Sequence, residues 1–180
     1  MDNIGKIKKL SSLIRGGTTL LMAALVLSDI VFWVFINSIN QQFLTVNSKP
    51  VPLASGELSV PLMLVGFLVS LLPLSVLLYG LLNLRRLFSD YSRGEIFAPG
   101  HLLLFRKMAK SIAFCVFFSV IYESAKSVLF SLGNPPGQRV LEIGFSSDKV
   151  FVLLFCGIIW VIAWIMDEGY RLSEENRLTV

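Results

Sequence analysis

The chain has 180 residues, of which 54% are hydrophobic and only 16% are charged. A soluble domain of this length carries about 25% charged residues, so the composition excludes an ordinary soluble protein. The formal net charge is +4, and the single histidine and two cysteines form no cluster that suggests a metal site.

Four long apolar stretches dominate the chain: residues 16–39, 58–84, 108–132 and 150–166. Each is long enough to cross a bilayer, which needs about 20 helical residues at ~1.5 Å per residue. Spans in lipid must be helices or closed barrels, and barrel strands alternate apolar and polar residues, whereas residues 20–27 are continuously apolar. We therefore predict an all-α integral membrane four-helix bundle, with residues 1–180 forming a single domain.

Lysine and arginine lie mostly on one side of the predicted spans. Twelve precede the first span, separate the second from the third or follow the fourth: Lys6, Lys8, Lys9, Arg15, Arg85, Arg86, Arg93, Arg106, Lys107, Lys110, Arg171 and Arg177. The opposite side has only Lys49, Arg139 and Lys149. Because basic residues favour the cytoplasmic side, we expect both termini and the middle loop in the cytoplasm. Anionic membrane lipids are the expected partners; nucleic-acid binding is not expected, since the basic residues flank spans.

The cytoplasmic middle segment predicts a helical hairpin that extends out of the membrane. The apolar pattern of the second span continues at helical spacing to about Arg93. Gly94 suits a C-cap position and Pro99 suits the first turn of the next helix, which places the turn at residues 93–98. The fourth span overruns the membrane in the same way.

The two outer loops, residues 40–57 and 133–149, permit a small β-hairpin cap. Pro50 and Pro52 exclude a helix in the first loop, and the residues around them favour a hairpin. Residues 139–145 of the second loop are compatible with a short strand.

Three charged residues lie deep inside the predicted spans, well away from the cytoplasmic ends: Asp29, Glu123 and Lys126. A charge near the bilayer centre costs at least ~2.5–3.5 kcal/mol, so these side chains should face the bundle or pair. Their depths, counted along the helices, agree within the length of a lysine side chain, and Glu123 and Lys126 are i,i+3 neighbours. We predict a polar cluster of these three residues with nearby hydroxyl groups: Ser28, Ser119 or Tyr122.

Three interpretations of this cluster remain open. It can be a proton- or ion-responsive site or a polar ligand pocket. It can be a charge-neutralised clasp that holds the first span against the third. Alternatively, Glu123 and Lys126 can lie at the outer interface and extend their charges into water.

The remaining polar residues give no catalytic or cofactor site. His101 has no ligand partner at suitable spacing, so we expect it at the surface or the interface. Cys115 and Cys156 lie at depths that differ by roughly 10 Å or more, which excludes a disulfide and predicts two free thiols. The sequence contains no nucleophile paired with a base and no phosphate-binding loop. We therefore predict that the protein is not an enzyme and binds no cofactor.

An acidic tail follows the fourth span. Its carboxylates and the basic groups of the middle segment form a candidate cytoplasmic docking surface: Glu174, Glu175, Arg85, Arg86 and Arg106. The alternative is a solvated helix end, where exposed ion pairs contribute only ~0–1 kcal/mol.

Two stretches resemble a known family. They are YSRGEIFAPGHLLLFRKMA (residues 91–109) and DEGYRLSEENRLTV (residues 167–180), and they are similar to domain-of-unknown-function family 2975. The first follows a "G-x-[IV]-F" pattern, and the second follows "G-x-x-L-x-E-E-N-x-L-T-[VI]". The chain departs from the family at Pro99, Gly100 and His101, where an asparagine is usual, and at Ala109, where a glycine is usual.

The resemblance implies a four-span protein of the bacterial inner membrane, without established activity, cofactor or binding residues. Members are often encoded beside a small helix-turn-helix repressor, which implies a cytoplasmic regulatory partner. We therefore expect a non-enzymatic regulatory, sensory or accessory protein that relays to such a partner. The alternative is a small transporter or channel that uses the polar cluster. It requires a homo-oligomer, because four helices make a poor pore. A third interpretation is a structural subunit of a larger membrane complex.

Overall fold

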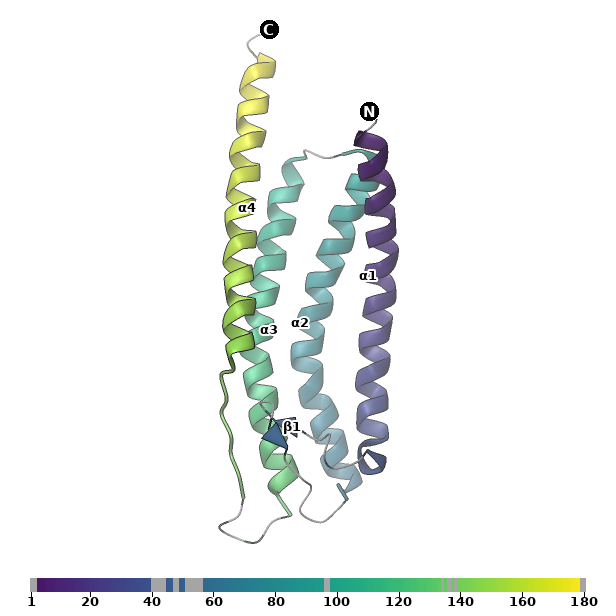
Figure 1. The fold of residues 1–180 in the computed structure, drawn as a ribbon, viewed down its shortest axis with the longest axis vertical. Helices are drawn as coiled ribbons and strands as arrows, with labels where there is room; N and C mark the ends of the chain where they lie inside the picture. Colours follow the sequence, from purple (N-terminus) through teal and green to yellow (C-terminus); the bar gives the residue numbers. More distant parts are fainter. Residues whose placement is uncertain are drawn as a thin grey trace. The chain divides into compact units, whose positions relative to one another are not determined.

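The computed structural model describes residues 3–39, 45–46, 49–50, 57–95, 98–133, 135, 137 and 139–178. Its helices are α1 (Asn3–Val34), α2 (Val60–Arg93), α3 (Pro99–Ser131) and α4 (Ser147–Leu178) (Figure 1). All four are long and apolar enough to cross a membrane. The prediction of an all-α protein with four apolar helices of membrane-spanning length is confirmed.

The helices are longer than the predicted spans. Each has 32 to 34 residues, or about 50 Å at ~1.5 Å per residue, whereas a bilayer core is about 30 Å thick. α1 ends at Val34, before the predicted end of its span at residue 39, and the short 3-10 helix η1 (Ile36–Ser38) follows. Asn37 fixes this end: its amide donates to the Leu58 carbonyl at 3.0 Å, and its Oδ1 accepts from the Leu58 N–H at 2.8 Å.

The turn between α2 and α3 forms where the sequence predicts it. Gly94 has a φ of +94°, which a residue with a side chain rarely adopts. Its N–H donates to the Tyr91 carbonyl at 3.0 Å, and the N–H of Glu95 donates to the Asp90 carbonyl at 3.1 Å. This pair of bonds is the Schellman C-cap, and α3 then begins at Pro99.

The predicted β cap is not supported. β1 (Thr45–Val46) and β2 (Lys49–Pro50) pair antiparallel, with Thr45 opposite Pro50 and Val46 opposite Lys49, but each strand has only two residues. Residues 139–146 of the second loop, all described, form no strand. Instead, backbone N–H groups of this segment donate to serine hydroxyls of α3, so these groups are not available to pair with a strand.

The contacts of the chain fall into two compact units. Unit 1 comprises Met1–Ala23, Val76–Ala113 and Val152–Val180, and unit 2 comprises Ala24–Ser75 and Phe114–Phe151. Unit 1 therefore contains both chain ends and the α2–α3 turn. It also contains twelve of the sixteen lysine and arginine residues. Every helix contributes residues to both units, so the units are not separate stretches of sequence.

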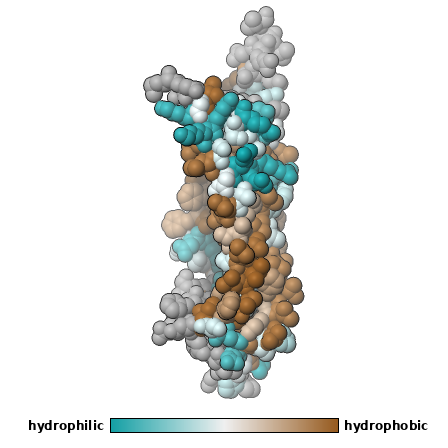
Figure 2. All heavy atoms as spheres, turned by 90° about the vertical axis from the view of Figure 1, so that its right-hand side faces the viewer, coloured by the Kyte–Doolittle hydropathy of each residue, from teal (hydrophilic) through white to brown (hydrophobic). Residues whose placement is uncertain are grey.

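Large apolar side chains are exposed on all four helices. Examples are Leu20 in α1, Leu68 in α2, Phe117 in α3 and Ile165 in α4, each more than half exposed. Figure 2 shows such an apolar surface on one face of the molecule. Exposed apolar surface of this extent is unfavourable in water and typical of contact with lipid, which agrees with the membrane-spanning assignment.

Candidate functional site

One turn of α3 in unit 2 holds an ion pair between a buried lysine and a half-buried glutamate. The Nζ atom of Lys126 lies 3.1 Å from Oε1 of Glu123, and the lysine is only 8% exposed. The same Nζ lies 5.1 Å from the centroid of the Tyr122 ring, within the range of a cation–π interaction. The charge of Lys126 is thus compensated twice by residues of its own helix.

Asp29 has a hydroxyl partner that the sequence did not indicate. The hydroxyl of Ser70, in α2, lies 2.9 Å from Oδ2 of Asp29 in α1 and 2.7 Å from the Phe67 carbonyl. Ser70 is buried. It was missed because a serine 41 residues away in the chain gives no local signal. Within the described residues, no ion pair joins Asp29 to Lys126.

The hydroxyl of Tyr122 lies within electrostatic range of two acidic side chains. The carboxylates of Asp29 and Glu123 both lie near enough to act electrostatically on its hydroxyl. Unit 2 therefore contains all three predicted residues, with Glu123 paired to Lys126 and Asp29 bonded to Ser70; that the three form one cluster stays a prediction. The predicted hydroxyl partners Ser28 and Ser119 instead donate to backbone carbonyls of their own helices, Leu25 and Val116.

A cluster of large buried apolar side chains packs against Tyr122. Trp33 is 3% exposed and belongs to a core cluster with Ile36, Leu129 and Phe130, against which Tyr122 packs. Trp33 lies close to α2 because residue 66 is glycine: a Cβ at that position would lie 2.0 Å from an indole carbon. Tyr122 of the polar cluster thus packs against buried apolar residues, and a low local dielectric strengthens electrostatic interactions.

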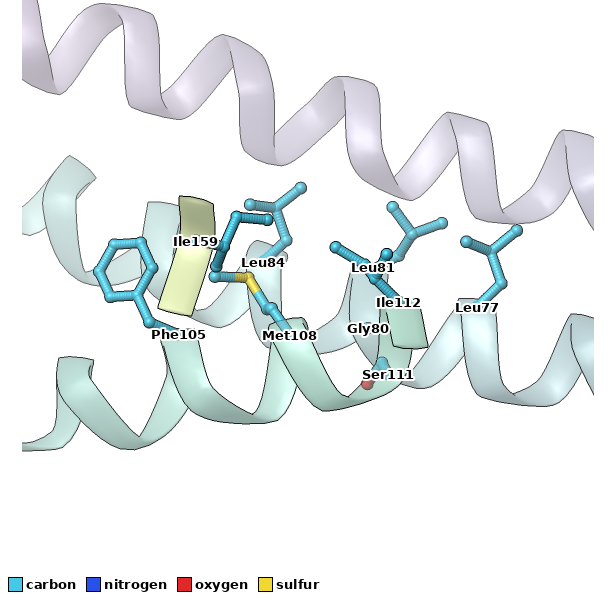
Figure 3. Close-up of a pocket in the computed structure, with 9 residues that line it drawn as sticks. All are labelled: Leu77, Gly80, Leu81, Leu84, Phe105, Met108, Ser111, Ile112 and Ile159. Atoms are coloured by element: carbon cyan, nitrogen blue, oxygen red, sulfur yellow. The ribbon is translucent and has the colours of Figure 1, made fainter. Parts of the chain in front are cut away.

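Unit 1 contains an apolar cavity of about 360 Å³ (Figure 3). It is lined by Leu77, Gly80, Leu81, Leu84, Phe105, Met108, Ser111, Ile112 and Ile159. The one hydroxyl in this lining donates to the Lys107 carbonyl at 2.7 Å. A cavity of this size and composition suits a small apolar ligand or part of an acyl chain and offers no group for bond-breaking chemistry.

A family comparison accounts for the two stretches that resemble known proteins. The model of a family described as "Protein of unknown function (DUF2975)" matches residues 36–180. The chain belongs to this family. Both stretches lie inside the match, and so do Ser70, Glu123 and Lys126, whereas Asp29 lies outside it. No curated protein and no solved structure matches the chain.

In this DUF2975 protein, the prediction that His101 is exposed at the surface is wrong. The residue is 2% exposed, with Nε2 3.4 Å from Oδ2 of Asp90 and its ring edge-to-face with Tyr91 at 5.2 Å between centroids. Asp90 also pairs with Arg93. The Gly94 turn causes this burial, because it folds the first turn of α3 onto the last turn of α2.

The candidate docking residues lie at the ends of three helices in unit 1. Arg85, Arg86 and Glu175 are exposed and Arg106 is half-buried, while the side chain of Glu174 lies outside the described part of the structure. On α4, Arg171 lies 3.6 Å from Glu168. That these groups bind a partner stays a prediction.

Both cysteines are free, as predicted. The thiol of Cys115 lies 3.8 Å from the Pro73 carbonyl, and that of Cys156 lies 2.9 Å from the Ala109 carbonyl. The described residues contain no group of three or more histidine, cysteine, aspartate or glutamate side chains that can hold a metal ion.

Proposed function

We propose that this DUF2975 protein is a non-enzymatic regulatory or sensory protein of the bacterial inner membrane. It responds to the state of the membrane or to a small apolar ligand, and it relays that state to a cytoplasmic partner. The bacterial location and the partner, a helix-turn-helix protein encoded nearby, are expectations that follow from the family resemblance.

The orientation in this proposal follows from charge. Unit 1 contains both termini, the α2–α3 turn and twelve of sixteen basic residues, and basic residues favour the cytoplasmic side of a membrane. We therefore place unit 1 on the cytoplasmic side. The helices exceed the bilayer core by roughly 20 Å, so their ends in unit 1 extend into the cytoplasm.

The observation that carries the relay proposal is the position of the cavity next to the docking residues. Leu81 and Leu84 line the cavity, and the exposed Arg85 and Arg86 continue the same helix directly after them. A ligand that fills or leaves the cavity shifts this turn of α2 and therefore moves the two guanidinium groups. Such a difference in contacts between two states is what a relay requires.

We expect the double variant Arg85→Gln/Arg86→Gln to bind the helix-turn-helix protein about 2–30-fold more weakly than wild type. Exposed ion pairs contribute ~0.2–1 kcal/mol each, and two are removed. The dissociation constant is measured with purified protein in lipid nanodiscs. Lys6→Gln/Lys9→Gln, which removes two exposed charges from α1, is the matched control. Equal weakening in both variants indicates general electrostatics, and no binding by wild type contradicts the proposed partner.

A second candidate function is a small oligomeric transporter or channel. The observation that favours it is Asp29, an acidic residue in an apolar span that bonds to Ser70 rather than to Lys126. Intramembrane acids of this kind often mark proton or ion routes. In liposomes, wild type should then show proton or cation flux that Asp29→Asn abolishes. Ser28→Ala, which changes only a bond within α1, should preserve the flux. Wild-type liposomes without flux would rule this candidate out.

A further inference from the structure

The segment between α3 and α4 has an unusual exposure pattern. Leu141, Ile143 and Phe145 are 64%, 72% and 58% exposed, whereas the residues between them are half-buried. An alternation of two is the period of an extended chain. Residues 139–146, called here the apolar strip, thus present three large apolar side chains on one face.

Hydroxyl groups of α3 hold the strip in place. The Ser131 hydroxyl accepts from the Val140 N–H at 3.0 Å, and the Ser127 hydroxyl accepts from the Glu142 N–H at 3.0 Å. Both serines are almost fully buried, at 1% and 0% exposed. At the other end of the strip, Nζ of Lys149 donates to the Gly144 carbonyl at 3.1 Å. Side chains therefore supply backbone partners that a strand or helix would otherwise supply.

Two independent counts place the strip at the boundary of the hydrocarbon layer. On α3, the distance from Lys110, the last basic residue before the apolar stretch, to Ser127 is about 26 Å at ~1.5 Å per residue, close to the ~30 Å thickness of a bilayer core. On α4, the apolar stretch between Lys149 and Asp167 measures about 27 Å on the same basis. Both counts start at the side of the hydrocarbon layer where the basic residues lie, and both place its opposite boundary beside the strip.

We propose that the apolar strip anchors this end of the protein by inserting Leu141, Ile143 and Phe145 among the acyl chains of the adjacent leaflet. Non-helical backbone is tolerated at membrane depth only where protein or water satisfies it. The serine and lysine bonds satisfy one edge of the strip, and the interfacial layer hydrates the other. Val150 and Phe151, near the start of α4, are also more than half exposed.

Site-directed labelling tests the strip in vesicles of phosphatidylcholine and phosphatidylglycerol. Leu141→Cys, Ile143→Cys and Phe145→Cys are made in a Cys115→Ala/Cys156→Ala background and compared with Asp148→Cys at the same level and Leu154→Cys within α4. We expect the strip positions to react with a membrane-impermeant maleimide about ten-fold more slowly than position 148. Attached nitroxides should respond to oxygen rather than to a water-soluble nickel chelate, as at position 154.

Two outcomes would overturn the proposal. Maleimide labelling as fast as at position 148 would place the strip in water, and disulfide-linked dimers through position 143 would show that a second copy covers it. Adding Ser127→Ala/Ser131→Ala to the Ile143→Cys variant provides a further check, on the bonds that hold the strip. This variant should retain the helical circular dichroism spectrum while position 143 becomes several-fold more reactive. Unchanged reactivity would show that the serines do not hold the strip against α3.

Discussion

Replacing Gly66 with alanine should lower the melting temperature of the detergent-solubilised protein by about 5–10 °C. The added Cβ would lie 2.0 Å from Cη2 and 2.2 Å from Cζ3 of Trp33, far inside van der Waals contact. The indole is 3% exposed and belongs to the core cluster, so either the indole must shift or α1 and α2 must move apart. Overpacking of this kind typically costs 1–3 kcal/mol, and ~1 kcal/mol shifts the melting temperature of a chain of this size by about 2–4 °C.

Gly157→Ala is the matched control, because nothing lies within 4 Å of the Cβ it would add in α4. It should leave stability unchanged or raise it slightly, since alanine favours a helix more than glycine. A second measurement isolates the clash: in a Trp33→Leu background, Gly66→Ala should cost much less than in wild type. Equal losses in both backgrounds would show that the close packing of Trp33 on α2 does not cause the effect.

Features set by local sequence were predictable. Four apolar stretches long enough for a bilayer gave the four helices, because lipid leaves the backbone few alternatives. The end of α2 at Arg93 and the start of α3 at Pro99 followed from Gly94 and Pro99 themselves. Cap chemistry acts within a few residues, so it can be deduced before any tertiary contact is known.

Features that depend on contacts between distant helices were not predictable. Ser70 reaches Asp29 only because α1 and α2 pack side by side, which itself requires a glycine at position 66. His101 is buried because the Gly94 turn returns the chain onto Asp90 and Tyr91. The pairing of Glu123 with Lys126 was accessible because it lies within one helical turn. The role of the cluster around Tyr122 stays a prediction, since its geometry fits a clasp as well as a polar site.

The second large effect concerns the ion pair of α3. We expect Glu123→Gln to destabilise the protein by about 3–5 kcal/mol, because it leaves the ammonium of Lys126 buried without a carboxylate. The lysine is 8% exposed, so it has little access to compensating water. Lys126→Met should cost less, since the side chain of Glu123 is 22% exposed and retains some solvation. Both values are measured as the free energy of unfolding in mixed micelles.

The double variant Glu123→Gln/Lys126→Met separates the clasp interpretation of the cluster from its interpretation as a proton, ion or ligand site. If the pair is a structural clasp, removing both charges should restore most of the stability that Glu123→Gln loses, because no buried charge remains unpaired. The double variant should then also bind the cytoplasmic partner as tightly as wild type does. If the double variant is stable but has lost partner binding or ion flux, the charges themselves act in function. If it is as unstable as Glu123→Gln, the pair is not the interaction that sets stability in this part of α3.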